Sequence, residues 1–131
     1  MPRVKDPALE GKNALVTGGT SGIGLAIARA LAAQGANVVI NGLGDAEANA
    51  DTANGIAEDC RVKAYTSPAN MCNPGEIAAM MAEAQEKLGT IDILVNNAGI
   101  QHVSAIEEFP VEKWDQIITI NLSSAFHTIR L

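Results

Sequence analysis

Short apolar runs alternate with stretches of helical periodicity along the chain. Residues 13–17 form an apolar run that ends in glycines, and Ile23, Ile27 and Leu31 then recur at four-residue spacing until Gly35. This pattern predicts a strand, a glycine-rich turn and a helix that ends at a glycine.

A second unit of the same kind follows. Residues 37–40 predict a second strand, and the Ala-rich residues 45–59 predict a helix that begins at Asp45, whose side chain can cap it. Residues 62–65 predict a third strand.

The helix over residues 73–88 has the strongest start signal. Asn73 is a capping residue, Pro74 occupies the first helical position and Glu76 the third. Its apolar stripe comprises Ile77, Met80, Met81, Ala84 and Leu88. Residues 91–95 then form a nearly continuous apolar run, which indicates a strand that is buried on both faces, as in a parallel sheet.

A last helix is predicted from Pro110 to the end of the chain. We expect its inner side to carry Trp114, Ile117, Ile118, Leu122, Ala125 and Ile129. Strand and helix thus alternate four times, which predicts one α/β domain over residues 1–131, a Rossmann-like, doubly wound parallel sheet with right-handed crossovers. Because no cap or breaker precedes Leu131, we expect the fold to be truncated after the fourth strand and its following helix.

Composition narrows the possible partners. Of 131 residues 47% are hydrophobic, which suits a packed core, and the net charge of −6 argues against nucleic acid as a partner. No apolar stretch reaches the length of a membrane span or resembles a signal peptide, so we expect a cytoplasmic protein.

Cys60 and Cys72 lack the spacing of a metal site, and we expect structural thiols, no disulfide and no metal.

The glycine-rich turn is the first candidate binding site. Residues 17–24 connect a strand to a helix, and their glycines allow the backbone to approach a pyrophosphate at the helix N-terminus. A glycine cluster also occurs at ordinary turns. The strand before it and the helix after it favour a dinucleotide.

Two motifs in this chain resemble those of the short-chain dehydrogenase family. Thr17, Gly18, Gly22 and Gly24 look like its cofactor motif, and residues 96–99, Asn-Asn-Ala-Gly, resemble its second signature. The resemblance implies a Rossmann fold and a nicotinamide cofactor bound by Gly18, Thr20, Ser21, Gly22, Ile23, Gly24, Leu43, Asn70, Met71, Asn97, Gly99 and Ile120. Turn chemistry is the alternative for Asn96 and Asn97, because Asn readily bonds its own backbone.

The same residues favour NAD over NADP. A 2′-phosphate needs a basic partner, and neither Ser21 nor residues 41–44 supply one. The usual ribose-binding acid at the end of the second strand is also missing. Asp45 follows Gly24 by 21 positions, but we interpret it as a helix cap. Asn70 and Met71 stand where the family commonly has Asp and an apolar residue beside the adenine.

Most of the family's catalytic residues are absent from these 131 residues. The family uses a Tyr with a Lys four positions later, whereas the only tyrosine, Tyr65, is followed at that distance by Ala69. By resemblance, Asn121 is the catalytic Asn, which interrupts its helix and positions the Lys through water. The alternative role for Asn121 is a structural hydrogen bond.

Four segments are very similar to the D-3-hydroxybutyrate dehydrogenase subgroup of this family, namely residues 41–45, 99–103, 107–114 and 121–127. The resemblance implies NAD-dependent interconversion of (R)-3-hydroxybutyrate and acetoacetate by a homotetrameric complete enzyme. Gln101 would bind the substrate carboxylate, and His102 would line the pocket or the surface. We expect the 131-residue chain alone to be inactive. The alternatives are a non-catalytic dinucleotide-binding module and one part of a split enzyme.

Overall fold

The computed structural model describes all residues from Met1 to Leu131 and contains one parallel sheet of four strands in the order β3-β2-β1-β4. The strands are β1 (Asn13–Val16), β2 (Asn37–Asn41), β3 (Ala64–Ser67) and β4 (Ile93–Val95). After β3 the chain crosses to the other side of β1 to form β4. The predicted doubly wound parallel sheet is confirmed, and its point of reversal lies between β1 and β4.

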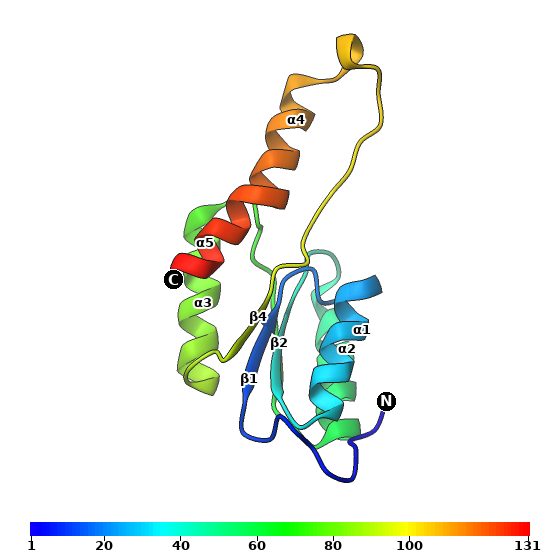
Figure 1. Ribbon diagram of the computed structural model, residues 1–131, viewed down its shortest axis with the longest axis vertical. Helices are drawn as coiled ribbons and strands as arrows, with labels where there is room; N and C mark the ends of the chain where they lie inside the picture. Colours follow the sequence, from blue (N-terminus) through cyan, green and yellow to red (C-terminus); the bar gives the residue numbers. More distant parts are fainter.

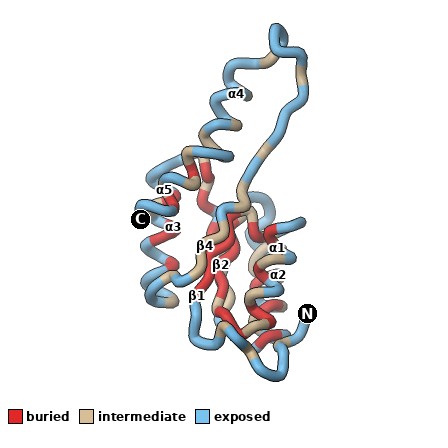
Figure 2. The backbone as a smooth tube through the Cα atoms, viewed as in Figure 1, coloured by how far each residue is buried: buried red, intermediate tan, exposed pale blue.

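Helices cover both faces of the sheet (Figure 1). On one face lie α1 (Gly22–Ala33) and α2 (Ala46–Cys60), and on the other lie α3 (Pro74–Leu88) and α5 (Ser124–Arg130). Side chains of a strand alternate between faces, so β1 contributes Ala14 and Val16 to the core beneath α1 and α2, and Leu15 to the core beneath α3. Figure 2 shows the buried residues concentrated in the strands and the adjacent sides of the helices.

The predicted caps of two helices are confirmed. Asp45 accepts hydrogen bonds from the backbone N–H of Glu47 (2.9 Å) and Ala48 (3.3 Å) at the start of α2. Asn73 likewise accepts from the N–H of Gly75 (2.9 Å) and Glu76 (3.2 Å), and Pro74 opens α3. These bonds satisfy N–H groups that have no partner within the helix.

Three local predictions were wrong in part. β4 begins at Ile93, two residues later than predicted. β3 begins two residues later than predicted, because the left-handed residue Arg61 (φ 56°) follows the end of α2 and pairing with β2 starts only at Ala64. The predicted stripe of α1 is confirmed for Ile27 and Leu31, which pack against the core, but is wrong for Ile23, which is 76% exposed. The buried residues of α1 are small ones, Gly24, Ala28, Ala32 and Ala33, which let the helix lie close to the strands.

The last helix differs most from its prediction. It consists of α4 (Val111–Ile118), a π-helical turn (Thr119–Ser123) and α5. In Figure 1, α4 and the loop before it project from the body of the molecule. Trp114 is 53% exposed and Leu122 65%, so the predicted inner stripe faces away from the rest of this chain, while Ser124 and Thr128 are the buried residues of α5. The helical spacing of these apolar residues was predicted correctly, but the side of the helix that faces the core was predicted wrongly.

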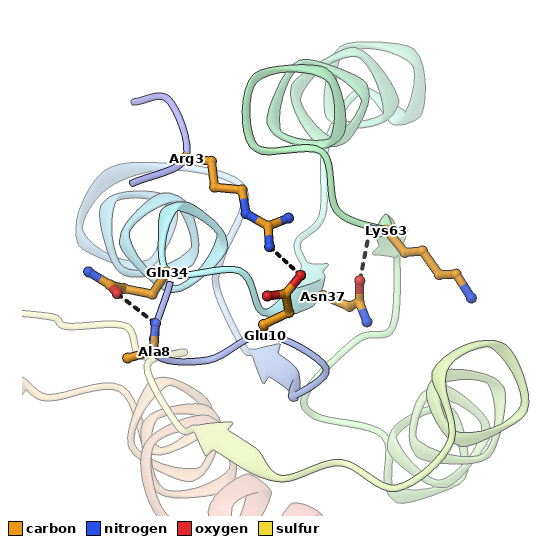
Figure 3. A network of polar contacts seen from close by, with 6 residues as sticks. All are labelled: Arg3, Ala8, Glu10, Gln34, Asn37 and Lys63. Atoms are coloured by element: carbon orange, nitrogen blue, oxygen red, sulfur yellow. Dashed lines mark hydrogen bonds and ion pairs between the residues drawn. The ribbon is translucent and has the colours of Figure 1, made fainter. Parts of the chain in front are cut away.

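The N-terminal segment lies across the end of α1 (Figure 3). The backbone N–H of Val4 donates to Ala33 O (2.9 Å), and that of Ala8 donates to Gln34 Oε1 (3.2 Å). An ion pair of 2.6 Å between Arg3 and Glu10 closes this segment on itself. The last carbonyls of α1 thereby gain partners.

Both cysteines are free. Cys60 is the last residue of α2, which extends one residue beyond its predicted end at Asp59. Its buried thiol donates to Met1 O (3.2 Å), and burial raises the pKa of Cys60. The structure contains no cluster of His, Cys, Asp and Glu able to hold a metal ion. It contains no helix with the length and apolar character required to cross a membrane.

Candidate functional site

A cleft of about 260 Å³ lies at the carboxyl ends of the strands. It is formed by the glycine loop after β1, the segments that follow β2, β3 and β4, and one residue of the π-helical turn. The lining residues are Gly18, Thr20, Ser21, Asn41, Gly42, Leu43, Ala69, Asn70, Met71, Ala98, Gly99, Ile100 and Ile120. The structure thus brings together eight sequence-predicted cofactor contacts from five segments, namely Gly18, Thr20, Ser21, Leu43, Asn70, Met71, Gly99 and Ile120.

The glycine loop requires glycine for two reasons, backbone conformation at Gly18 and Gly22 and close packing at Gly24. Gly18 and Gly22 adopt positive φ angles of 61° and 54°, which L residues rarely adopt. Gly24 lies directly under the loop, because a Cβ atom placed on it would be 2.1 Å from Gly18 O and 2.5 Å from Asn97 Nδ2. The helix and the glycine loop are therefore in close contact at Gly24.

The first turn of α1 has unpaired donors. The N-cap Ser21 makes no side-chain capping bond, and the N–H groups of Gly22, Ile23 and Gly24 have no hydrogen-bond partner within the chain. The first turn contains no acidic residue that would compete with a bound anion. Because unpaired N–H groups meet the positive end of the helix dipole here, this turn suits an anion such as a pyrophosphate.

The segment after β4 is bound to the glycine loop. The Thr17 hydroxyl accepts from the N–H groups of Asn97 (3.0 Å) and Ala98 (2.9 Å), and Asn97 Nδ2 donates to Thr17 O and Gly18 O (3.1 Å each). These bonds join residues about 80 positions apart, so the turn interpretation of Asn97 is wrong. Asn97 does not line the cleft itself. Its neighbour Asn96 accepts from Thr128 Oγ1 at 2.6 Å.

Asn41 was not among the residues predicted for the site. This last residue of β2 is 2% exposed, and its carboxamide accepts from Gly18 N (3.2 Å) while donating to Ser67 O (3.2 Å) and Ala69 O (2.9 Å). The one feature of the sequence that could have indicated its role is that this amide residue directly follows the apolar run of residues 38–40. Asp45 caps α2, as predicted, and its carboxylate is therefore engaged with backbone N–H groups.

The segment after β3 places Asn70 and Met71 in the cleft. Asn70 Oδ1 accepts from Cys72 N (2.9 Å), which occupies part of its acceptor capacity. Met71 is buried and also packs with the core beneath α3. Both residues therefore have structural contacts in addition to their place on the cleft wall.

Asn121 lies in the π-helical turn, so the predicted interruption of the helix is confirmed. Its side chain pairs with one peptide group, accepting from Ile100 N and donating to Ile100 O (2.9 Å each). The structural-bond alternative therefore describes the contacts of Asn121 in this chain. Gln101 and His102 follow Ile100, are exposed and do not line the cleft.

The only tyrosine does meet a lysine, but away from this cleft. Lys87 Nζ lies 4.8 Å from the ring centroid of Tyr65, and the same lysine pairs with Glu83 at 2.7 Å. Tyr65 is part of β3, as predicted, and neither it nor Lys87 lines the cleft. The described cleft therefore contains a binding surface and no Tyr–Lys pair.

Comparison with known proteins identifies the family. The profile described as short chain dehydrogenase matches residues 12–131. The chain is 59% identical over 123 residues to a D-beta-hydroxybutyrate dehydrogenase of Cupriavidus necator, covering 94% of this chain and 47% of that protein. It is 54% identical over 119 residues to one of Rhizobium meliloti, covering 91% and 46%.

A solved structure agrees with this assignment. A short chain dehydrogenase of Burkholderia cenocepacia in complex with NADP is 35% identical, with a TM-score of 0.88 over 93% of this chain and 49% of that one. The chain thus spans about half the length of the relatives it matches. On the matched profile and these relatives, the chain belongs to the short-chain dehydrogenase family.

Proposed function

We propose that the cleft binds NAD and that these residues form the nucleotide-binding part of an oxidoreductase that interconverts (R)-3-hydroxybutyrate and acetoacetate. The unpaired N–H groups of Gly22, Ile23 and Gly24 carry the proposal, because they form a donor site for the pyrophosphate beside the cleft-lining Ser21. Bound NAD would supply the hydride acceptor, and the chain would hold and orient it.

The lining residues fit the parts of a dinucleotide. Leu43 offers an apolar face, and Asn70 and Met71 lie on the adjacent wall, where the adenosine would bind. Gly99 and Ile120 form the other end, next to the segment that Asn121 binds. We propose the nicotinamide for this second end, since it lies near Gln101, the residue we propose for the substrate carboxylate.

The choice of NAD over NADP depends on charge. None of the lining residues is a lysine or an arginine, whereas a 2′-phosphate needs a cation to compensate its charge. The Burkholderia cenocepacia relative is described in complex with NADP, so the family fold itself does not exclude the phosphate. We propose NAD from the uncharged lining of this cleft.

The substrate proposal rests on the relatives. Two D-beta-hydroxybutyrate dehydrogenases are 59% and 54% identical to this chain. Residues 1–131 contain no Tyr with a Lys four positions later, so we propose that they bind the nucleotide without turning over substrate. The homotetramer and the cytoplasmic location expected for a complete enzyme stay predictions.

A non-catalytic dinucleotide-binding module is the second candidate. It is favoured by one observation, that Tyr65 and Lys87 meet outside the cleft. A chimaera can separate the two functions: residues 1–131 replace the matching N-terminal part of the Cupriavidus necator enzyme. Oxidation of (R)-3-hydroxybutyrate by the chimaera would support the dehydrogenase. A folded chimaera that binds NAD without oxidising this substrate would favour the module.

Calorimetric titration tests the nucleotide directly. Purified residues 1–131 should bind NAD more tightly than NADP, and heat release should vanish when the loop is distorted by Gly24→Ala. Equal affinity for both nucleotides would contradict the specificity argument. The absence of binding to a folded chain would refute the proposed function.

A further inference from the structure

We propose that Asn41 is a positioning residue that fixes the spacing of the two walls of the cleft, and that its carboxamide does not serve as a ribose ligand. The inference rests on the proposed function, since it assumes that the cleft binds a dinucleotide. It concerns the end of β2, where NAD-binding folds commonly place a ribose-binding acid.

The contacts of Asn41 connect three segments of the chain. Its side-chain oxygen accepts from Gly18 N (3.2 Å), and its backbone oxygen accepts from Gly19 N (2.7 Å). Its Nδ2 donates to Ser67 O (3.2 Å) and Ala69 O (2.9 Å) on the far side. One residue therefore ties the glycine loop to the segment that leads to Asn70.

Gly18 is held on both sides by carboxamides. Asn41 binds its N–H, and Asn97 Nδ2 binds its C=O at 3.1 Å. With both polar groups engaged and φ at +61°, the Gly18 backbone is fixed relative to β2 and to the segment after β4. A change at Asn41 therefore acts on the lining of the cleft even though Asn41 is 2% exposed.

The amide is chemically required at this position. An Asp at position 41 could still accept from Gly18 N, but it has no N–H to offer Ser67 O and Ala69 O. An ionised carboxylate would then face two carbonyl oxygens in a buried place, which is unfavourable. Asn41→Asp therefore separates two interpretations by sign: a ribose ligand would gain affinity from the acid, and a positioning residue would lose it.

Asn13, the first residue of β1, provides a matched control at the end of the sheet opposite to the cleft. It is 7% exposed, and its Nδ2 donates to Leu88 O and Thr90 O (2.9 Å each) while its Oδ1 accepts from Asn37 Nδ2 (2.9 Å). Like Asn41, it is therefore a buried carboxamide that donates to two carbonyl oxygens and accepts once, but it does not line the cleft.

The experiment compares Asn41→Asp and Asn41→Ala with Asn13→Asp and Asn13→Ala in the full 131-residue chain. The Kd for NAD is measured by calorimetry, and amide hydrogen exchange is followed by mass spectrometry without nucleotide. We expect the Kd to rise on the order of tenfold in both Asn41 variants, the equivalent of about one buried hydrogen bond. Exchange at Gly18 and Gly19 should also accelerate. Both Asn13 variants should lose stability but keep the wild-type Kd and the exchange of the glycine loop.

Each outcome has a definite meaning. A lower Kd for Asn41→Asp would overturn the proposal in favour of a ribose ligand. An equal rise of Kd in the Asn13 variants would overturn it in favour of general destabilisation. If the wild-type protein binds no nucleotide, the proposed function fails and the positioning role fails with it. If the Kd for NAD is the same in the wild-type protein and in the Asn41 variants, only the positioning role is overturned. Should the Asn41 variants unfold, exchange and Kd are measured on the milder Asn41→Ser, for which the same rise in Kd is expected and an unchanged Kd overturns the proposal.

Discussion

The contact between Gly24 and the glycine loop makes Gly24→Ala an informative substitution. Gly24 is a buried residue of α1, and an added Cβ would lie 2.1 Å from Gly18 O and 2.8 Å from Gly18 C. A carbon and an oxygen that are not bonded normally approach to about 3.3 Å. The loop or the helix must therefore move by about 1 Å to accept one methyl group.

The expected cost combines two opposing effects. Overpacking a well-packed region costs about 1–3 kcal/mol, and the upper end applies because the obstructing atoms belong to the backbone. Alanine is favoured over glycine in a helix by about 0.5–1 kcal/mol, which offsets part of this cost. We expect the free energy of unfolding to fall by about 2 kcal/mol, or roughly 6–10 °C in Tm for a chain of this size.

Gly55→Ala is the matched control. Gly55 lies in the interior of α2, and a Cβ placed on it has no atom within 4 Å. The same chemical change should therefore raise the free energy of unfolding by about 0.5–1 kcal/mol. Helix propensity acts in both variants, so the difference between them isolates the contact of Gly24 with Gly18.

Thermal and urea denaturation followed by circular dichroism measure both effects, and calorimetry with NAD measures the site. Gly24→Ala should lose stability and nucleotide binding together, while Gly55→Ala should keep the wild-type Kd. The reasoning is refuted if Gly24→Ala is as stable as Gly55→Ala, because the loop would then accommodate the methyl group freely. Wild-type affinity in a destabilised Gly24→Ala would show that the loop geometry does not determine binding.

Three further predictions follow from single side chains. Asn121→Ala removes both hydrogen bonds to the Ile100 peptide and should accelerate amide exchange at Ile100. The free energy of unfolding should fall by only about 0.5–1.5 kcal/mol, because the site is exposed. Unchanged amide exchange at Ile100 would exclude the pairing. Burial raises the pKa of Cys60, so the folded state binds the thiol proton more tightly than the unfolded state does. The free energy of unfolding should therefore fall as the pH rises above about 8.5. Iodoacetamide should react more slowly with Cys60 than with Cys72, and equal rates would contradict the burial of Cys60. Ile77→Ala removes a fully buried side chain and should cost about 2–5 kcal/mol in urea denaturation, whereas a cost under about 1 kcal/mol would show that α3 is loosely packed.

The regular elements could be predicted because their signals are local. A capping Asp or Asn, a proline at the first position and a glycine-rich turn each act within a few residues, and Asp45 and Asn73 cap their helices as predicted. The start of β3 was misplaced because strand ends are set by pairing with β2. That pairing joins residues that are distant in sequence.

The candidate site could be predicted in part. Residues recognised by motif or resemblance, such as Gly18, Leu43 and Asn70, do come together in one cleft. Asn41 escaped prediction because its role depends on carbonyl oxygens of Ser67 and Ala69, which the fold brings to it. No spacing in the sequence indicates such a contact.

The sequence by itself determined the order and type of the elements, the glycine turn and the family. Hydrophobic period and caps are properties of neighbouring residues, so they can be read without the fold. Only the tertiary structure decided which way each apolar stripe faces and which polar groups are buried. The stripe containing Trp114 and Leu122 points away from this chain, and Asn41 points into it, because burial depends on what packs against a residue.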